Sequence, residues 1–347
     1  MRYKASDLHI AVGLPPVLRV HGRLLQTPYE PLTPEDTRRM ADQFLTKAQQ
    51  HSLKTLREFD FNYFSGPLHV FRASFFHDRG TIAGAFRLLS RPIPTIASLE
   101  IPPVIENLCG LTSGLILVTG ATGSGKNELV AAMIDSINSS NSRNIVAIED
   151  RTEYFHPPKL SVIRQREIGQ DVLNVAAALC GLRSQDADVV VVETLRDLET
   201  MRTALALASN GRLVFASIAT VSAASTVDRL IESFPENEQD AIRLDLSNSL
   251  QAVLCTQLIP NANGIGKIMA QEIMIVRPEI REMIRQSMTD RIPSFIESQD
   301  NHDGMQTMAM SLRDLYLAGR ITRDMAIARS MNRIEMEGLL SRTDEKV

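Results

Sequence analysis

The chain has 347 residues, of which 44% are hydrophobic and 22% are charged, which is typical of soluble globular proteins and sufficient for two domains. The net charge of −4 argues against a general nucleic-acid binder, because such proteins usually carry a basic excess. Three scattered cysteines, no apolar run of about 18 residues and no signal-peptide pattern predict a cytoplasmic protein without disulfides or a transmembrane helix.

Residues 1–90 have the pattern of a mixed α/β domain. Alternating apolar residues flank a turn at residues 13–16, and a helix is expected over residues 32–55, with Thr33 as its N-cap and Pro34 at its first position. Residues 59–89 read as two or three strands, with turns at 65–67 and 78–80.

The proline-rich segment 91–103 is expected to link two domains. Short apolar runs then alternate with helical patterns over residues 104–275, which predicts a parallel sheet covered by helices on both faces. Residues 276–347 read as mostly helical.

A glycine-rich loop follows the first of these apolar runs and precedes a helix, and we expect it to bind phosphate. Its glycines allow the backbone N–H groups to point inward, and its lysine can reach the β and γ phosphates of a nucleotide. The loop consists of Gly120, Ala121, Thr122, Gly123, Ser124, Gly125 and Lys126.

The two residues after the glycine-rich loop depart from the usual motif. A Ser or Thr normally ligates Mg²⁺ at the position of Asn127, whose amide oxygen can also bind a cation but extends further from the backbone. Glu128 either points inward, where it weakens phosphate binding, or faces solvent and favours the start of the helix.

Acidic residues follow two other apolar runs. Glu149, Asp150 and Glu153 follow the run at 144–148, and Glu193 follows the run at 189–192. Carboxylates at these strand ends hold Mg²⁺ or activate the attacking water in nucleotide hydrolysis. We expect Glu149 and Asp150, with Asn127, to hold the metal.

Several segments together resemble the type IV pilus retraction ATPases, the twitching-motility PilT family of hexameric secretion ATPases. The similarity covers nearly the whole chain and runs through "ASDLHIAVGLPPVLRVHG", "IEDRTEYFH", "DVVVVETLRDLETMRTAL", "GRLVFASIATVSAASTVDRLIESFP" and "AQEIMIVRPEIREMIRQ". It implies an N-terminal PAS-like α/β domain and a C-terminal RecA-like P-loop domain with a helical tail. The family usually starts with a further helix, which this chain lacks.

The departures from the family lie at chemical positions. Arg151 replaces the proline of the family's Asp box, although Glu153 keeps the acid implied to activate water. The Gly-Glu pair of the family's Walker B motif is Glu193–Thr194 here, so the carboxylate either points away from the phosphates or reaches inward through a bulge. Arg212 and Ala219 stand where the family's His box has histidines.

The resemblance also implies roles for residues outside the glycine-rich loop. Arg72, Arg79 and Arg87 stabilise phosphate charge at a subunit boundary or face solvent as ordinary strand arginines. Arg281 and Arg285 are candidates for contact with a neighbouring subunit or the pilus base.

The resemblance, with its departures at chemical positions, implies three alternative functions. The first is an ATP-binding subunit of the retraction motor family with weak or lost hydrolysis and a weakened Mg²⁺ site, assembled as a homo-hexamer or with an active relative on an inner-membrane pilus base protein. The second is an active hexameric ATPase that drives pilus retraction. The third is a structural or regulatory module of the pilus base that binds no nucleotide.

Overall fold

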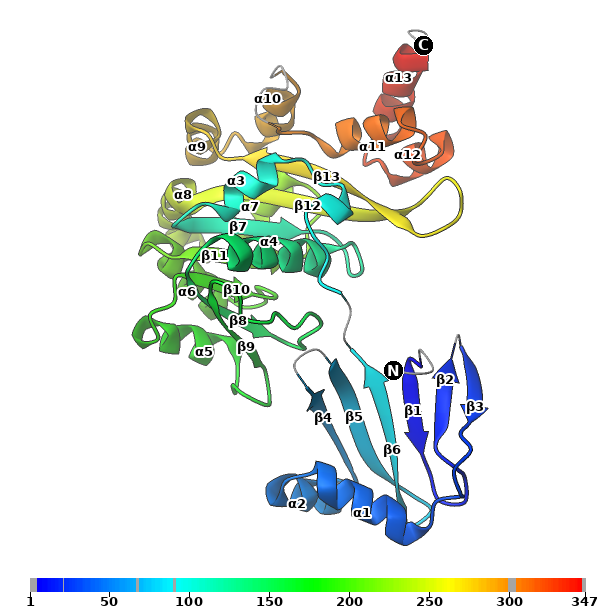
Figure 1. Cartoon of the computed structure of the whole chain (residues 1–347). Coiled ribbons are helices and arrows are strands. Elements are labelled where there is room, and N and C mark those ends of the chain that lie inside the picture. Colours follow the sequence, from blue (N-terminus) through cyan, green and yellow to red (C-terminus); the bar gives the residue numbers. More distant parts are fainter. Residues whose placement is uncertain (1–4, 21, 67–68, 90–91, 299–303, 345–347) are drawn as a thin grey trace. The chain divides into compact units, whose positions relative to one another are not determined.

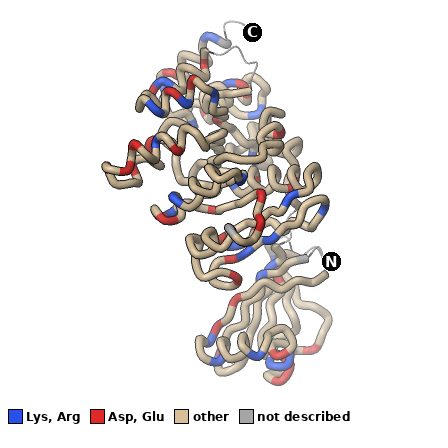
Figure 2. The backbone as a smooth tube through the Cα atoms, turned by 90° about the vertical axis from the view of Figure 1, so that its left-hand side faces the viewer, with Lys and Arg blue, Asp and Glu red and all other residues tan. Residues whose placement is uncertain are grey.

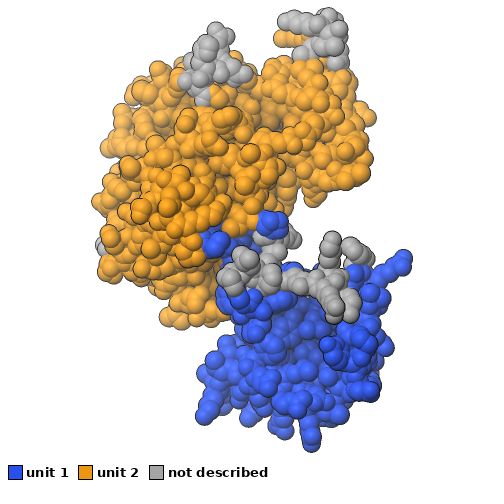
Figure 3. Space-filling view, in the orientation of Figure 1, with its two compact units in different colours: residues 1–92, 153–157 blue, residues 93–152, 158–347 orange. Residues whose placement is uncertain are grey.

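The computed structural model describes residues 5–20, 22–66, 69–89, 92–298 and 304–344. It divides into two compact units, which Figure 3 shows in different colours. Unit 1 contains residues 1–92 and 153–157, and unit 2 contains residues 93–152 and 158–347. The boundary expected between residues 90 and 91 lies outside the described residues.

Unit 1 is a six-stranded antiparallel sheet with two helices (Figure 1). Its strand order is β3-β2-β1-β6-β5-β4. The elements are β1 (Asp7–Ile10), β2 (Val17–Val20), β3 (Arg23–Gln26), α1 (Pro34–Phe44), α2 (Lys47–Leu56), β4 (Glu58–Ser65), β5 (His69–Asp78) and β6 (Thr81–Leu88).

The helix expected over residues 32–55 is two helices. Thr33 caps α1 through a capping box with Asp36, as its position predicts, and Pro34 is the first helical residue. The prediction of one continuous helix is wrong, because Leu45 is extended and Thr46 forms a second capping box that starts α2. Two good N-caps in one apolar pattern therefore mark two helices.

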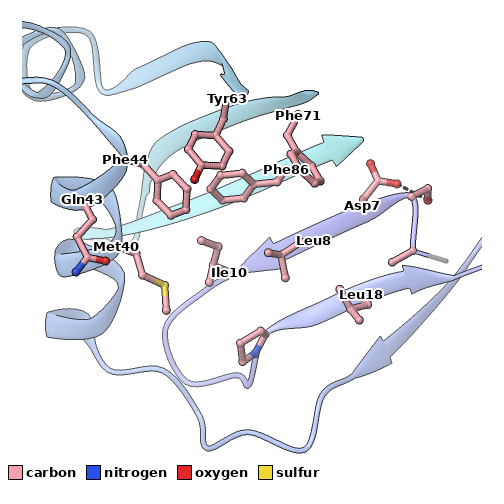
Figure 4. A pocket seen from close by; sticks show the side chains of 13 residues that line it. Asp7, Leu8, Ile10, Leu18, Met40, Gln43, Phe44, Tyr63, Phe71 and Phe86 are labelled. Atoms are coloured by element: carbon pink, nitrogen blue, oxygen red, sulfur yellow. Dashed lines mark hydrogen bonds between the residues drawn. The ribbon is translucent and has the colours of Figure 1, made fainter. Parts of the chain in front are cut away.

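One face of the unit 1 sheet carries its apolar core. Phe61, Phe75 and Phe86 pack with Ala41 and Leu45. A cavity of about 560 Å³ extends this apolar layer between α1 and strands β1, β2, β4, β5 and β6 (Figure 4). Its lining is almost wholly apolar and aromatic, so it does not suit a phosphate group.

Unit 2 is a seven-stranded sheet in the order β13-β12-β7-β11-β10-β8-β9, parallel except for β13. Its strands are β7 (Gly114–Thr119), β8 (Asn144–Glu149), β9 (Val162–Glu167), β10 (Val189–Val192), β11 (Leu213–Ile218), β12 (Leu250–Pro260) and β13 (Lys267–Ile275). Its α-helices are α3 (Val104–Cys109), α4 (Lys126–Ser140), α5 (Val175–Gly181), α6 (Leu198–Ser209), α7 (Ala223–Glu232), α8 (Glu236–Ser249), α9 (Pro278–Arg285), α10 (Ile292–Ser298), α11 (Met308–Leu317), α12 (Arg323–Arg329) and α13 (Arg333–Asp344).

Helices cover both faces of this sheet (Figure 1), as the alternation of apolar runs and helical patterns predicts. Along β7, Leu115 and Leu117 belong to the apolar layer that includes α6, α7 and α8. Ile116 and Val118 belong to the opposite layer, where α4 packs. All the residues of β7 are buried, which explains why its sequence is a continuous apolar run.

The second half of the proline-rich segment 91–103 belongs to the core of unit 2. Ile96 and Ile101 are buried in the layer that contains α4. Glu100 and Arg320 form a two-pronged ion pair with N–O distances of 2.5 and 2.7 Å. The burial of Ile96 and Ile101 therefore fixes this half of the segment to unit 2.

Charged residues of both signs are interspersed along the trace of the chain (Figure 2). At an ionic strength of about 0.1 M, salt screens the interactions between exposed charges that are more than about 10 Å apart. Within the residues that the structure describes, no helix is long and apolar enough to cross a membrane.

Candidate functional site

The glycine-rich loop, residues 120–126, connects the carboxyl end of β7 with α4. Gly120, Gly123 and Gly125 have φ angles of 140°, 76° and 99°, which disfavour residues with a side chain. At Gly120 there is also no room for one, since a Cβ atom would lie 2.5 Å from the carbonyl oxygen of Thr256 on β12. The backbone conformation of the loop therefore favours glycine at these positions.

Buried hydroxyls fasten this loop to the sheet. The hydroxyls of Ser124 and Thr256 lie 3.1 Å apart, and Thr256 also donates to the carbonyl of Thr119 at 3.3 Å. Ala121, Thr122 and Gly123 remain exposed at the crest. The loop is thus held in shape next to the N-terminus of a 15-residue helix, where N–H groups attract anions.

Lys126 lies across the glycine-rich loop. Its ammonium donates to the carbonyls of Gly120 and Ala121 at 2.7 and 2.8 Å. Burial holds the pKa of Lys126 below its usual value, while the carboxylates of Glu128 and Glu193 act in the opposite direction. Two acidic side chains therefore share the electrostatic environment of this lysine.

Three glutamates end neighbouring strands. Glu149 ends β8 and pairs in register with Glu167 at the end of β9, and Glu193 follows β10 on the other side of β8. Glu149 accepts hydrogen bonds from Thr152 at 3.0 Å and from Gln165 at 3.2 Å. Burial, reinforced by the two other carboxylates, raises the pKa of Glu149 to about 7.

Asp150 and Glu193 are joined directly. The backbone N–H of Asp150 donates to Oε2 of Glu193 at 2.5 Å. The carboxylate of Asp150 forms an ion pair with the guanidinium of Arg196. Glu193 therefore accepts a backbone hydrogen bond, and a cation already balances the charge of Asp150.

The residues fit the phosphates of a nucleotide better than they fit a metal ion. The loop glycines, the helix N-terminus and Lys126 suit an anion. Within the described ranges, no three His, Cys, Asp or Glu side chains are grouped to hold a metal. Mg²⁺ bound with phosphates needs only one or two carboxylates, so the predicted set of Asn127, Glu149 and Asp150 stays a prediction.

The other predicted site residues belong to unit 1. Glu153 is exposed, at the start of the segment 153–157. Arg72 donates to Asn62 at 3.4 Å, and Arg87 donates to Asp7 at 2.8 Å. Arg79 is exposed in the turn between β5 and β6, with a φ of 49°. Their roles at a nucleotide remain predictions.

The sequence patterns missed four residues that shape this region. Thr152 and Arg196 contact the predicted acids, Glu167 lies in register with Glu149 and accepts the N–H of Thr152, and Thr256 supports the glycine-rich loop. Glu167 ends a strand of mostly exposed and half-buried residues, which gives no apolar run to mark it. Arg196 and Thr256 depend on contacts between segments distant in sequence, whereas Thr152 contacts Glu149 three residues away.

The model of the type II/IV secretion system protein family matches residues 103–327. The chain belongs to this family. It is 36% identical over 322 residues to the type IV pilus retraction ATPase PilT of Pseudomonas aeruginosa, with 93% of each chain covered. It is 32% identical over 323 residues to the type IV pilus ATPase PilU of the same organism, covering 93% of this chain and 84% of that one.

The fold also matches this family. The crystal structure of the pilus retraction motor PilT with bound ADP superposes with a TM-score of 0.84 at 37% identity, over 97% of this chain and 96% of that chain. The resemblance and the two-domain α/β fold predicted from the sequence are thereby confirmed.

Proposed function

We propose that this chain is an ATP-binding subunit of the type IV pilus retraction motor family in which hydrolysis is weak or lost. It would assemble as a homo-hexamer, or with an active relative, on an inner-membrane pilus base protein. The observation that carries the proposal is a shaped glycine-rich loop beside acids that are engaged with other groups of the protein.

Binding is supported by the loop and by the relatives. The three glycines keep their left-handed φ angles, and Lys126 lies at the loop carbonyls. PilT, which has been crystallised with bound ADP, is 37% identical to this chain. We infer that the loop N–H groups and Lys126 hold the β and γ phosphates of ATP. Mg²⁺, when bound with the nucleotide, would neutralise part of the phosphate charge.

Weak hydrolysis is supported by the state of the acids. Glu193 accepts a backbone N–H, Asp150 is paired with Arg196, and Glu149 has a pKa of about 7. Losing a general base lowers a rate roughly 10²- to 10⁴-fold. Glu153 is then the acid that could orient water, and its exposure favours the second candidate, an active ATPase.

The binding part of the proposal is tested by calorimetry with Mg-ATP. Lys126→Ala should weaken binding at least about tenfold, because it removes a charge-assisted contact with phosphate. Lys159→Ala is the matched control, since Lys159 pairs with Asp135 in the same unit. Absence of binding by the wild-type protein would favour the third candidate, a module without nucleotide, to which the proximity of Glu128 to Lys126 points.

A further inference from the structure

We propose that Glu193 is a positioning residue that fixes the β8 loop, residues 150–153, and is not a general base. The proposal rests on the proposed function, because the β8 loop carries Glu153. In this proposal the carboxylate of Glu193 accepts a hydrogen bond from the backbone of Asp150. The sequence alone indicates that it accepts a proton from the attacking water.

The contact between β8 and β10 carries this inference. The backbone N–H of Glu193 donates to the carbonyl of Ile148 at 3.1 Å and so extends the ladder between the two strands by one residue. The side chain of Glu193 then accepts the N–H of Asp150 at 2.5 Å. Glu193 is therefore hydrogen-bonded to the residue before Glu149 and to the residue after it. Hydrogen bonds to a charged acceptor are stronger than those between neutral groups.

Other contacts hold the next residues of the β8 loop. Thr152 is buried, with its hydroxyl donating to Glu149 at 3.0 Å and its N–H to Glu167 at 3.4 Å. Arg196 pairs with the carboxylate of Asp150. Glu153 is the next residue along, so its backbone starts from a point fixed by Asp150 and Thr152. Loss of the Glu193 contact would therefore loosen the segment that presents Glu153.

Glutamine distinguishes the two roles of Glu193. Its amide oxygen accepts a backbone N–H, as a carboxylate does, but it takes no proton from water. Glu193→Gln should therefore retain the position of the loop, and Glu193→Ala should not. A general base would be lost equally in both variants.

The experiment is amide hydrogen exchange at Asp150 in the full chain without nucleotide. Glu193→Ala should exchange roughly ten- to a hundredfold faster than wild type, the change expected when a hydrogen bond to a charged acceptor is lost. Glu193→Gln should keep a neutral hydrogen bond and so exchange clearly more slowly than Glu193→Ala, within about tenfold of wild type. Glu199→Ala, which removes an exposed carboxylate from the first turn of α6, is the matched control and should leave the exchange unchanged.

Two results would overturn the proposal: no acceleration in Glu193→Ala, or equal acceleration in both variants. Phosphate release gives a second readout if the wild type turns over. Glu193→Gln should then keep kcat and Glu193→Ala should lower it, while KM should fall alike in both variants because each removes a carboxylate that acts on Lys126; loss of release in Glu193→Gln would instead identify a base. Failure of the wild type to bind ATP would contradict the proposed function. The exchange experiment needs no nucleotide, so it would still test the role of Glu193.

Discussion

At the residue scale, we expect the charge around Lys126 to affect the proposed binding of nucleotide. In the proposed complex its ammonium would contact phosphate groups. The carboxylates of Glu128 and Glu193 also interact electrostatically with this ammonium. Acidic groups near an anion site oppose the binding of phosphate through Coulomb repulsion. The two residues after the glycine-rich loop, Asn127 and Glu128, therefore separate this chain from an ordinary nucleotide site.

Restoring the usual motif should strengthen the site. We expect the double substitution Asn127→Ser and Glu128→Thr to tighten Mg-ATP binding about tenfold, because it supplies a hydroxyl for Mg²⁺ and removes a repulsive carboxylate. Calorimetry measures the change, and Glu128→Thr alone separates repulsion from metal ligation. Unchanged affinity in the double variant would show that neither residue limits binding.

Glu149 makes stability depend on pH. Its pKa of about 7 in the folded chain lies above the ordinary value of 4.5, so the folded state binds more protons between these values. The free energy of unfolding should therefore fall as the pH rises through this window, by up to roughly 3 kcal/mol. The free energy of unfolding of Glu149→Gln should not show this fall, because glutamine does not ionise.

Urea denaturation at about pH 5 and about pH 8 measures this effect without nucleotide or metal. The stability of Glu149→Gln relative to wild type should increase between the two pH values, whereas Glu199→Gln, at an exposed site, should show no such increase. A constant difference between Glu149→Gln and wild type would mean that Glu149 is ionised throughout.

The residue types at the site were predictable, but their contacts were not. The glycine pattern predicts a loop with left-handed φ angles, which Gly120, Gly123 and Gly125 show. The hydrogen bond from Asp150 to Glu193 joins residues 43 positions apart. It depends on the register of β8 with β10, which a single sequence does not encode locally.

At the scale of elements, the charged face of α9 contacts the end of α8. A role of Arg281 and Arg285 in contact with a neighbouring subunit or the pilus base stays a prediction. In the structure Arg281 donates to the carbonyls of Ser247 and Asn248 at 2.5 and 2.8 Å, and Arg285 donates to the side chain of Asn248 at 2.7 Å. These groups lie at the C-terminus of α8, where unpaired carbonyls attract cations.

We expect Arg281→Ala to lower the free energy of unfolding by about 1–3 kcal/mol, because it leaves helix-end carbonyls without a charged donor. Arg291→Ala, at an exposed position after α9, is the control and should have little effect. Urea denaturation measures both variants. Equal stability of the two would show that water replaces the contact of Arg281.

Strong local patterns predicted elements well, and mixed patterns did not. The apolar run "VVVV" predicts β10, and the N-cap Thr33 with Pro34 at the first helical position predicts the start of α1. β9 was missed because exposed and half-buried residues dominate it. Its place at the edge of the sheet removes the continuous apolar run by which buried parallel strands are recognised.

At the scale of the whole molecule, packing holds the segment that follows unit 1. Ile101 is buried in unit 2, whereas both partners of the ion pair between Glu100 and Arg320 are exposed. We expect Ile101→Ala to lower the free energy of unfolding by about 2–4 kcal/mol through the cavity it leaves, and Arg320→Ala to change stability little. Thermal unfolding measures both variants, and the reverse order would contradict this account.

The chain belongs to the type II/IV secretion system protein family and is similar to pilus ATPases, but this similarity does not decide turnover. PilT is 36% identical to this chain over nearly its full length, so the fold was predictable from motifs that run through both units. Turnover depends on whether a few carboxylates face the nucleotide. In this chain Glu193 and Asp150 are engaged with protein groups, which supports binding without efficient hydrolysis.

The most direct test is phosphate release on a sample whose Mg-ATP binding has been measured by calorimetry. We predict saturable binding with release at or near the background rate. Steady release that Glu153→Gln abolishes would contradict this prediction and would identify a working motor whose base is Glu153.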